Sequence, residues 1–168
     1  ETYKDLEIFI KNKEEIIKKL KGLSKEEADK LLDKYMEENR ELTSKINENE
    51  DYFFEENQGY YSDKKMKETE KFFNKYGLKF LDVGGAGLIV PSSFYYSIFK
   101  DYVSDEYRDY LELTSKYNDV DVVYIPDNLS IQETGERNAA FQDFLDKYPD
   151  TKFKTLASVY RFYIDDYI

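Results

Sequence analysis

The sequence predicts a single, mainly α-helical domain of about seven helices in antiparallel hairpins, with one short β-hairpin near residues 78–90. Three observations predict this fold. Apolar residues recur at spacings of three and four along most of the chain, which is the period of one helix face. Ser24 with Glu27 and Ser130 with Glu133 form capping boxes, which satisfy free N–H groups at a helix start. A glycine-rich run between two short apolar segments is typical of a hairpin turn.

The amino-acid composition limits the possible folds and the possible functions. The 168 residues suit one domain, and 17 Tyr and 12 Phe distinguish the chain from a disordered acidic sequence. Cysteine and histidine are absent, which excludes disulfides, thiolate nucleophiles, Cys/His zinc sites and imidazole acid–base chemistry. The net charge of -11 comes with lysines interleaved among the acids, so direct binding to nucleic acid or to an anionic membrane surface is disfavoured. No apolar run is long enough for a transmembrane segment.

The N-terminal part predicts two amphipathic helices that form a hairpin. The first runs from about residue 2 to 21 and is ended by Gly22. The second begins after Ser24 and either continues to Phe53 or breaks near residues 47–49. Asn39 falls on the apolar stripe of this helix, where an apolar residue is expected.

The middle part contains the only expected departure from helix. A third helix stops at Gly77, and residues 78–83 and 88–90 form the two strands of the hairpin, which Pro91 ends. Two further helices follow, and residues 118–129 have no helical period. The expected caps of these helices are Ser62, either Ser92 or Ser93, and Ser104.

The C-terminal part predicts a second strongly marked hairpin. Pro149 disfavours helical geometry at Tyr148, so the sixth helix is expected to stop there, and Asp150 is the expected N-cap of the seventh. The apolar face of the seventh helix comprises Phe153, Leu156, Ala157, Tyr160, Ile164 and Tyr167.

These elements make one domain over residues 1–168. Its predicted parts are an N-terminal hairpin (2–56), a β-hairpin with middle helices (62–117) and a C-terminal hairpin (130–168). The predicted core consists of large apolar residues from all three parts: Leu31, Tyr35, Phe73, Phe80, Phe94, Ile98, Phe99, Tyr110, Leu111, Phe141, Phe144, Leu145, Leu156 and Tyr160.

Three sequence patterns could indicate a catalytic or ligand-binding site. For each of them we favour a structural role instead. The glycines at 84–87 lack the spacing and the Lys-Ser/Thr of a phosphate loop, so they predict a turn. Asp119, Asp121 and Asp127 do not follow the register of an EF-hand, which leaves only a looser calcium site open. Adjacent acids such as 105–106 and 165–166 suit a two-carboxylate hydrolase only if they face one cleft. We therefore predict no catalytic residue, metal site or cofactor.

The candidate binding residues are Tyr96, Tyr124 and Arg137. Tyr124 lies in the apolar part of the 118–129 loop, which either recognises a partner or packs down on the aromatic face of the sixth helix. In the first case Tyr96 and Tyr124 are exposed with Arg137 within reach, and in the second Arg137 pairs with a neighbouring acid.

Part of the chain resembles a family of uncharacterised exported bacterial proteins, many of them lipoproteins. The residues that carry this resemblance are 23–35 (LSKEEADKLLDKY), 76–80 (YGLKF), 93–113 (SFYYSIFKDYVSDEYRDYLEL) and 130–150 (SIQETGERNAAFQDFLDKYPD). FLDKYPDT at 144–151 is also similar to the joint between helices in tetratricopeptide-like lipoproteins. The resemblance implies a helical module outside the cytoplasm, secreted or lipid-anchored, and the start at Glu1 rather than Met fits either a processed or a trimmed chain.

We therefore expect a non-enzymatic extracytoplasmic interaction or scaffold module whose partner is a protein or an envelope polymer. One alternative is an acidic decoy that blocks a basic, nucleic-acid-binding partner. The net charge of -11 is consistent with this alternative. A second alternative is a hydrolase that uses two carboxylates.

Overall fold

The computed structural model describes residues 4–48, 54–55, 59–60, 63–82, 86–117, 119 and 130–162. The described helices are α1 (Lys4–Leu20), α2 (Lys25–Asn47), α3 (Asp63–Asn74), α4 (Ser92–Phe99), α5 (Asp105–Tyr117), α6 (Ile131–Lys147) and α7 (Lys154–Phe162). The strands are β1 (Phe54–Glu55), β2 (Gly59–Tyr60), β3 (Lys79–Asp82) and β4 (Ala86–Ile89). The predicted mainly helical fold with a short β-hairpin near residues 78–90 is confirmed.

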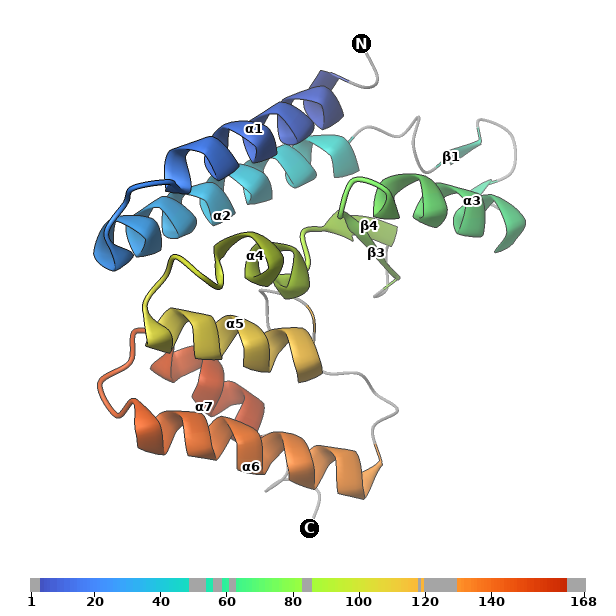
Figure 1. Ribbon diagram of the computed structural model, residues 1–168. Helices are drawn as coiled ribbons and strands as arrows, with labels where there is room; N and C mark the ends of the chain where they lie inside the picture. Colours follow the sequence, from blue (N-terminus) through green and yellow to red (C-terminus); the bar gives the residue numbers. More distant parts are fainter. Residues whose placement is uncertain are drawn as a thin grey trace.

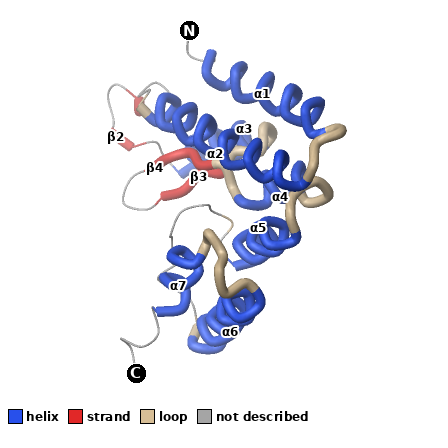
Figure 2. Tube along the Cα trace, turned by 90° about the vertical axis from the view of Figure 1, so that its left-hand side faces the viewer, coloured by secondary structure: helices blue, strands red, loops and turns tan. Residues whose placement is uncertain are grey.

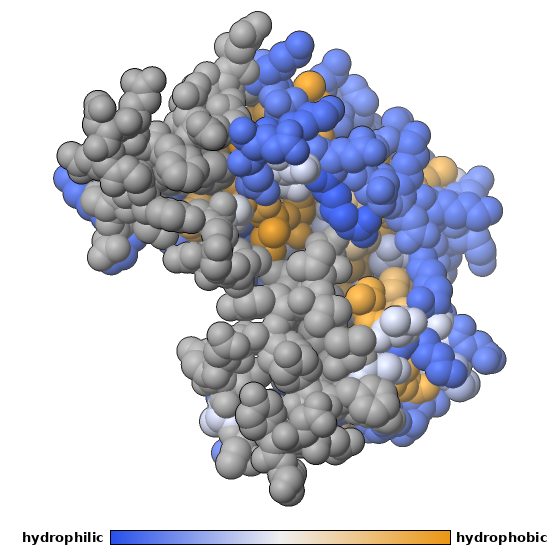
Figure 3. Space-filling model, turned by 180° about the vertical axis from the view of Figure 1, so that it is seen from behind, coloured by the Kyte–Doolittle hydropathy of each residue, from blue (hydrophilic) through white to orange (hydrophobic). Residues whose placement is uncertain are grey.

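The helices are arranged as successive pairs. From α1 and α2 at one end, through α4 and α5, to α6 and α7 at the other, the pairs follow one another down the molecule (Figure 1). The β3–β4 hairpin and α3 lie to one side of this stack (Figure 1). In the side view the hairpin lies next to α2 (Figure 2). Seen from behind, apolar residues come to the surface near the middle of the molecule, next to a largely hydrophilic surface (Figure 3).

The two N-terminal helices follow from the amphipathic pattern and its caps. Gly22 has a φ of +90°, the left-handed conformation that ends helices, and the Ser24–Glu27 capping box opens α2 as predicted. Of the two predicted ends for α2, the structure has the earlier one, because α2 stops at Asn47.

The β3–β4 hairpin is antiparallel, with Phe80 opposite Leu88 and Lys79 opposite Ile89. Gly77 precedes it at a φ of +88°, as the sequence predicts for the end of the third helix. A second antiparallel pair, β1 with β2, was not predicted from the sequence, because two residues per strand give no period to recognise.

Two predicted helix caps are wrong. Neither Ser92 nor Ser93 caps α4, whose N-cap is Pro91; the carboxylate of Asp119 instead accepts a hydrogen bond of 2.8 Å from the Ser93 N–H. A cap supplied from 26 residues away leaves no local signal. Asp150 does not cap α7, which begins only at Lys154. The cap expected at Ser62 lies outside the described residues.

The described apolar side chains form two cores. The larger core joins α1, α2, α3, α4, the β3–β4 hairpin and one face of α5, and the smaller one joins the other face of α5 to α6 and α7. Of the predicted core, Leu31, Phe80, Ile98, Leu145 and Leu156 are only partly buried, and Tyr160 lies outside the described side chains. The remaining predicted core residues are buried.

The turn between α6 and α7 connects the two cores. Phe153 packs against both, with its ring stacked on Tyr110 at 3.9 Å and edge-on to Tyr107 at 4.9 Å. Lys152 Nζ lies 4.2 Å from the centre of the Tyr107 ring and donates to both carboxylate oxygens of Asp33 on α2, each at 2.8 Å. The residues after Pro149 therefore attach the C-terminal hairpin to the rest of the molecule.

A polar cluster on α5 supports the same attachment. Asp109 accepts hydrogen bonds of 2.7 Å from both Lys147 and Tyr148, and Arg108 pairs with its other oxygen at 3.1 Å. Burial raises the pKa of the Asp109 carboxyl, but the hydrogen bonds from Lys147, Tyr148 and Arg108 outweigh it, so the pKa lies below its usual value. Asp109 therefore stays ionised and holds α6 to α5.

Candidate functional site

A polar stripe lies on the inner side of the second half of α2. Asn39, Thr43 and Asn47 recur every four residues, so they share one face of the helix. Asn39 is 0% exposed and Thr43 is 7% exposed, and both stand among the apolar residues that pack against α4 and β4. Buried polar groups are costly unless they are hydrogen-bonded, so the partners of this stripe define its role.

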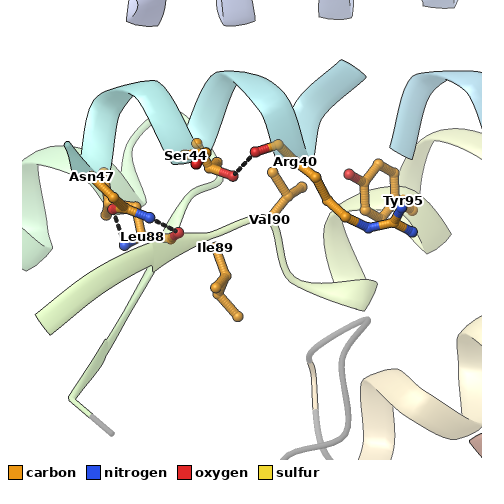
Figure 4. A pocket seen from close by; sticks show the side chains of 8 residues that line it. Arg40, Ser44, Asn47, Leu88, Ile89, Val90 and Tyr95 are labelled. Carbon is orange, nitrogen blue, oxygen red and sulfur yellow. Dashed lines mark hydrogen bonds between the residues drawn. The ribbon is translucent and has the colours of Figure 1, made fainter. Parts of the chain in front are cut away.

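Asn47 connects α2 to the β-hairpin. Its Nδ2 donates to the Leu88 carbonyl at 3.0 Å, and its Oδ1 accepts from the Leu88 N–H at 2.7 Å (Figure 4). The carboxamide thus pairs with the outer edge of β4 as a neighbouring strand would. This pairing covers the exposed edge and fixes the position of β4 against the helix.

Asn39 positions a tyrosine from α4. Its Nδ2 donates to the Tyr95 hydroxyl at 3.2 Å, and Tyr95 is edge-on to the ring of Tyr35 at 5.8 Å. Burial raises the pKa of the Tyr35 hydroxyl to about 12, although the nearby Asn39 amide opposes part of the rise. Both tyrosines are buried, so the Tyr95 ring is held in one place between α2 and α4.

An open pocket lies between the two anchor points, and we call it the α2–β4–α4 pocket. It has a volume of about 240 Å³. Its lining comes from α2, from β4 with the residue after it, and from α4: Arg40, Thr43, Ser44, Asn47, Leu88, Ile89, Val90 and Tyr95. Aliphatic residues of the strand and the tyrosine ring provide apolar surface, and the helix provides hydroxyl, amide and guanidinium groups.

Arg40 is the charged group of this pocket. Its side chain runs from α2 along the pocket toward Tyr95 (Figure 4). The guanidinium Nη1 donates to Glu37 on the preceding turn at 2.7 Å, and both side chains of this pair are at least half exposed. An exposed ion pair of this kind contributes little to stability.

The residues predicted from the sequence lie elsewhere. Tyr96 lies on α4, half-buried against the larger core, with Lys100 Nζ 5.8 Å from the centre of its ring. Arg137 lies on α6 and is only 3% exposed, so it does not present its charge at the surface. Tyr124 lies outside the described residues. A binding site formed by all three stays a prediction.

The patterns considered for catalysis or metal binding have structural roles where they are described. Asp105 pairs with Lys25 and Arg108, and Glu106 accepts a hydrogen bond from Thr151. The Asp119 carboxylate caps α4, and its Oδ2 lies 3.8 Å from Nζ of Lys79. In the part of the chain that the structure describes, no three acidic side chains come close enough to hold a metal ion. Asp121, Asp127, the acids at 165–166 and the glycines at 84 and 85 lie outside that part.

Sequence reasoning missed Arg40, Thr43 and Asn47 as site residues. The available signal was Asn39, which is polar on an apolar stripe, together with the polar residues four and eight positions later. A polar stripe along the buried side of a helix indicates non-local hydrogen bonds, but it does not name the strand that accepts them.

Comparison of the chain with protein-family models, with curated proteins and with solved structures gives no match. Within the described ranges, no helix combines the length and the apolar character needed to cross a membrane. The geometry of the pocket therefore provides the basis for a functional interpretation.

Proposed function

We propose that this chain is a non-enzymatic interaction module, and that the α2–β4–α4 pocket receives one apolar side chain of a protein partner. The observation that carries this proposal is the size and lining of the pocket. Pockets that enclose a whole small molecule usually have about 300–1,000 Å³. A volume of about 240 Å³ suits a single large side chain instead.

The rigidity of the pocket walls supports a binding role. Asn47 holds β4 through two hydrogen bonds, and Asn39 holds the Tyr95 ring. Walls fixed in this way do not have to be ordered when a partner binds, which reduces the entropic cost of association. The helical stack places this preformed site on a scaffold of packed helices.

The pocket favours a protein over an envelope polymer as the partner. Its strand side consists of Leu88, Ile89 and Val90, which match an aliphatic or aromatic side chain. A sugar would need several polar partners at once, whereas the Asn47 carboxamide already donates to and accepts from Leu88, and the Thr43 hydroxyl already donates to the Asn39 carbonyl. We also propose an extracytoplasmic location, which the resemblance to exported bacterial proteins supports and which protease accessibility on intact source cells would test.

A pair of substitutions tests the proposed function. Ser44 lines the pocket, so Ser44→Phe fills its mouth, whereas Lys45→Phe adds the same ring to an exposed neighbour outside the lining. The probes are fluorescein-labelled hexapeptides Gly-Ser-Gly-Lys-Lys-Z, in which Z is Leu, Ile, Val, Met or Phe. Fluorescence anisotropy should show that Ser44→Phe weakens binding at least about tenfold, the equivalent of about 1.4 kcal/mol, while Lys45→Phe binds as the unmodified chain does.

Circular dichroism and thermal unfolding of both variants serve as controls for folding. Amide chemical shifts that move on peptide addition should map to residues 40–47 and 88–90. Binding that is equal in Ser44→Phe and Lys45→Phe, or shifts confined to other helices, would show that the pocket is not the binding site.

A further inference from the structure

The C-terminal hairpin of α6 and α7 is joined to α2 and α5 by polar contacts that are segregated by charge. Asp33 on α2 and Glu106 and Asp109 on α5 accept hydrogen bonds from the hairpin. Their donors lie at the end of α6 and in the turn after it: Lys147, Tyr148, Thr151 and Lys152. We call these acceptors and donors the hairpin joint.

We propose that the hairpin joint is an acid-sensitive contact. Protonation of its carboxylates raises the population of an open state, in which the hairpin has separated from α5 while the larger core stays folded. A carboxylate offsets the charge of a lysine only while it is ionised, and the protonated acid accepts weaker hydrogen bonds. The proposal does not involve the α2–β4–α4 pocket, so it is independent of the proposed function.

Asp109 is the carboxylate on which the joint depends most. Its side chain is 22% exposed, and it accepts hydrogen bonds of 2.7 Å from Lys147 and from the Tyr148 hydroxyl. On its own helix it faces the guanidinium of Arg108 at 3.1 Å and the carboxylate of Asp105. A partly buried carboxylate with several charge-assisted bonds contributes more than an exposed ion pair does.

The direction of the pH effect follows from the pKa of Asp109. Burial raises this pKa, but the hydrogen bonds from the hairpin and from Arg108 lower it by more, so it lies below its usual value. A carboxyl whose pKa is lowered by folding stabilises the folded state above its unfolded pKa, and this contribution is lost as the pH falls through the folded pKa. The contribution of Asp109 is therefore complete at neutral pH and is lost below about pH 4.

Asp33 and Glu106 add two further contacts of the same kind. Lys152 Nζ donates to both oxygens of Asp33 at 2.8 Å, and the Tyr107 hydroxyl from α5 donates to one of them at 2.8 Å. The Asp33 side chain is 53% exposed, so its pair with Lys152 is weak by itself. Glu106 accepts a hydrogen bond from the Thr151 hydroxyl, and this bond also loses its charge in acid.

The division of the apolar core determines which part separates. The larger core takes its buried side chains from α1 to α5 and from the residues of the β3–β4 hairpin. Among the described side chains, the smaller core has few fully buried members: Tyr110, Phe141, Phe144 and Ala157. Phe153 touches both cores but is only partly buried. Because a part with fewer buried contacts opens at a lower free energy, the hairpin should separate before the larger core unfolds.

Amide variants reproduce the protonated joint at neutral pH. The joint variant combines Asp33→Asn, Glu106→Gln and Asp109→Asn, which keep the shape of each side chain and remove its charge. The measurement is the protection factor of each backbone amide, its hydrogen-exchange rate relative to an unstructured peptide at the same pH. At neutral pH the joint variant should lose protection at least about tenfold in α6 and α7 and keep it in α1.

A matched control variant removes the same number of negative charges elsewhere. It combines Glu41→Gln, Asp101→Asn and Glu112→Gln, three exposed positions outside the joint. Protection in α6 and α7 should stay within about twofold of the unmodified chain. If the joint variant does not fold, Asp109→Asn alone replaces it, with an expected loss of protection in α6 and α7 of at least about threefold.

The pH dependence provides the second arm of the test. From about pH 6 to about pH 3 the unmodified chain should lose protection in α6 and α7 at least about tenfold more than in α1. The joint variant should show little of this pH dependence, since its amides do not titrate. The proposal is overturned if the joint and control variants behave alike, or if α1 loses as much protection as α6 and α7. A pH dependence that is the same in the joint variant and the unmodified chain would overturn it too.

Discussion

Gly22 and Gly77 have the same backbone conformation in different surroundings. Their φ angles are +90° and +88°, in the left-handed region that side chains disfavour. A Cβ added at Gly22 would meet no atom within 4 Å, whereas one at Gly77 would lie 2.5 Å from Cδ2 of Phe94. Phe94 stacks on Phe9 at 5.4 Å and is buried, so its ring can make room for a Cβ only by shifting against packed neighbours.

Alanine substitutions at the two glycines separate backbone strain from steric overlap. Gly22→Ala should lower the free energy of unfolding by about 1–2 kcal/mol, the cost of the left-handed conformation for a residue with a Cβ. Gly77→Ala should lower it by a further 1–3 kcal/mol or so, because the Phe94 ring must leave its position. Urea denaturation of both variants measures the difference, and equal losses would show that Phe94 adapts without cost.

Asn39 shows how far residue-level reasoning reaches. Its polar side chain on an apolar stripe could be recognised from the sequence as an exception. The reason for the exception could not, because the Tyr95 hydroxyl that it contacts is 56 residues away. Periodicity predicts which face of a helix is buried, but it does not predict what stands opposite that face.

At the scale of elements, local signals were reliable and distant ones were not. The capping boxes at Ser24 and Ser130 are present as predicted, because their partners lie three residues away. The cap of α4 was mispredicted, because the Ser93 N–H donates to the carboxylate of Asp119, a residue that lies beyond α5 in the sequence. The start of α7 was mispredicted because residues 149–153 form a turn. In this turn the Thr151 hydroxyl accepts a hydrogen bond from the Phe153 N–H and donates one to the Glu106 carboxylate.

The candidate site follows the same division. Its helix and its strand were both predicted, since each has a clear pattern of its own. Their contact was not, because Asn47 and Leu88 are 41 residues apart and no sequence rule pairs a carboxamide with a strand edge. The pocket exists only where α2, β4 and α4 meet, so none of the three segments contains it alone.

Asn47→Ala tests whether one side chain holds the β-hairpin to α2. The substitution leaves the N–H and the carbonyl of Leu88 without their partner, which should lower the free energy of unfolding by about 1–3 kcal/mol. Asn74→Ala is the matched control, because Asn74 is exposed on α3 and such positions usually change stability by less than about 0.5 kcal/mol. Hydrogen exchange at the Leu88 amide should accelerate only in Asn47→Ala. Equal stability of the two variants would contradict the anchoring role.

At the scale of the whole molecule, the two cores share α5, and among the described side chains Phe153 and a few polar groups also join them. Phe153 touches both cores, Lys152 bonds Asp33 on α2, and Asp109 bonds Lys147 and Tyr148. Exposed ion pairs contribute little to stability, whereas a large aromatic side chain contributes through its buried area. The Phe153 ring should therefore contribute more than these ion pairs to the attachment of the C-terminal hairpin.

Phe153→Ala tests this attachment. Truncation removes the ring contacts with Tyr107 and Tyr110 but leaves the apolar residues inside each core in place. The free energy of unfolding should fall, by less than the roughly 3–5 kcal/mol of a fully buried phenylalanine, because Phe153 is only partly buried. Native-state hydrogen exchange should accelerate first in α6 and α7, since a unit that has lost its contacts opens separately from the rest.

Lys154→Ala provides the control for Phe153→Ala. Lys154 is the next residue along the chain and is exposed, so its truncation should leave exchange in α6 and α7 unchanged. If Phe153→Ala instead accelerates exchange to the same extent in α1, α2, α6 and α7, the two cores unfold as one cooperative unit. In that case the residues after Pro149 do not act as a joint, and the stability of the pocket on α2 would depend directly on the packing of the C-terminal hairpin.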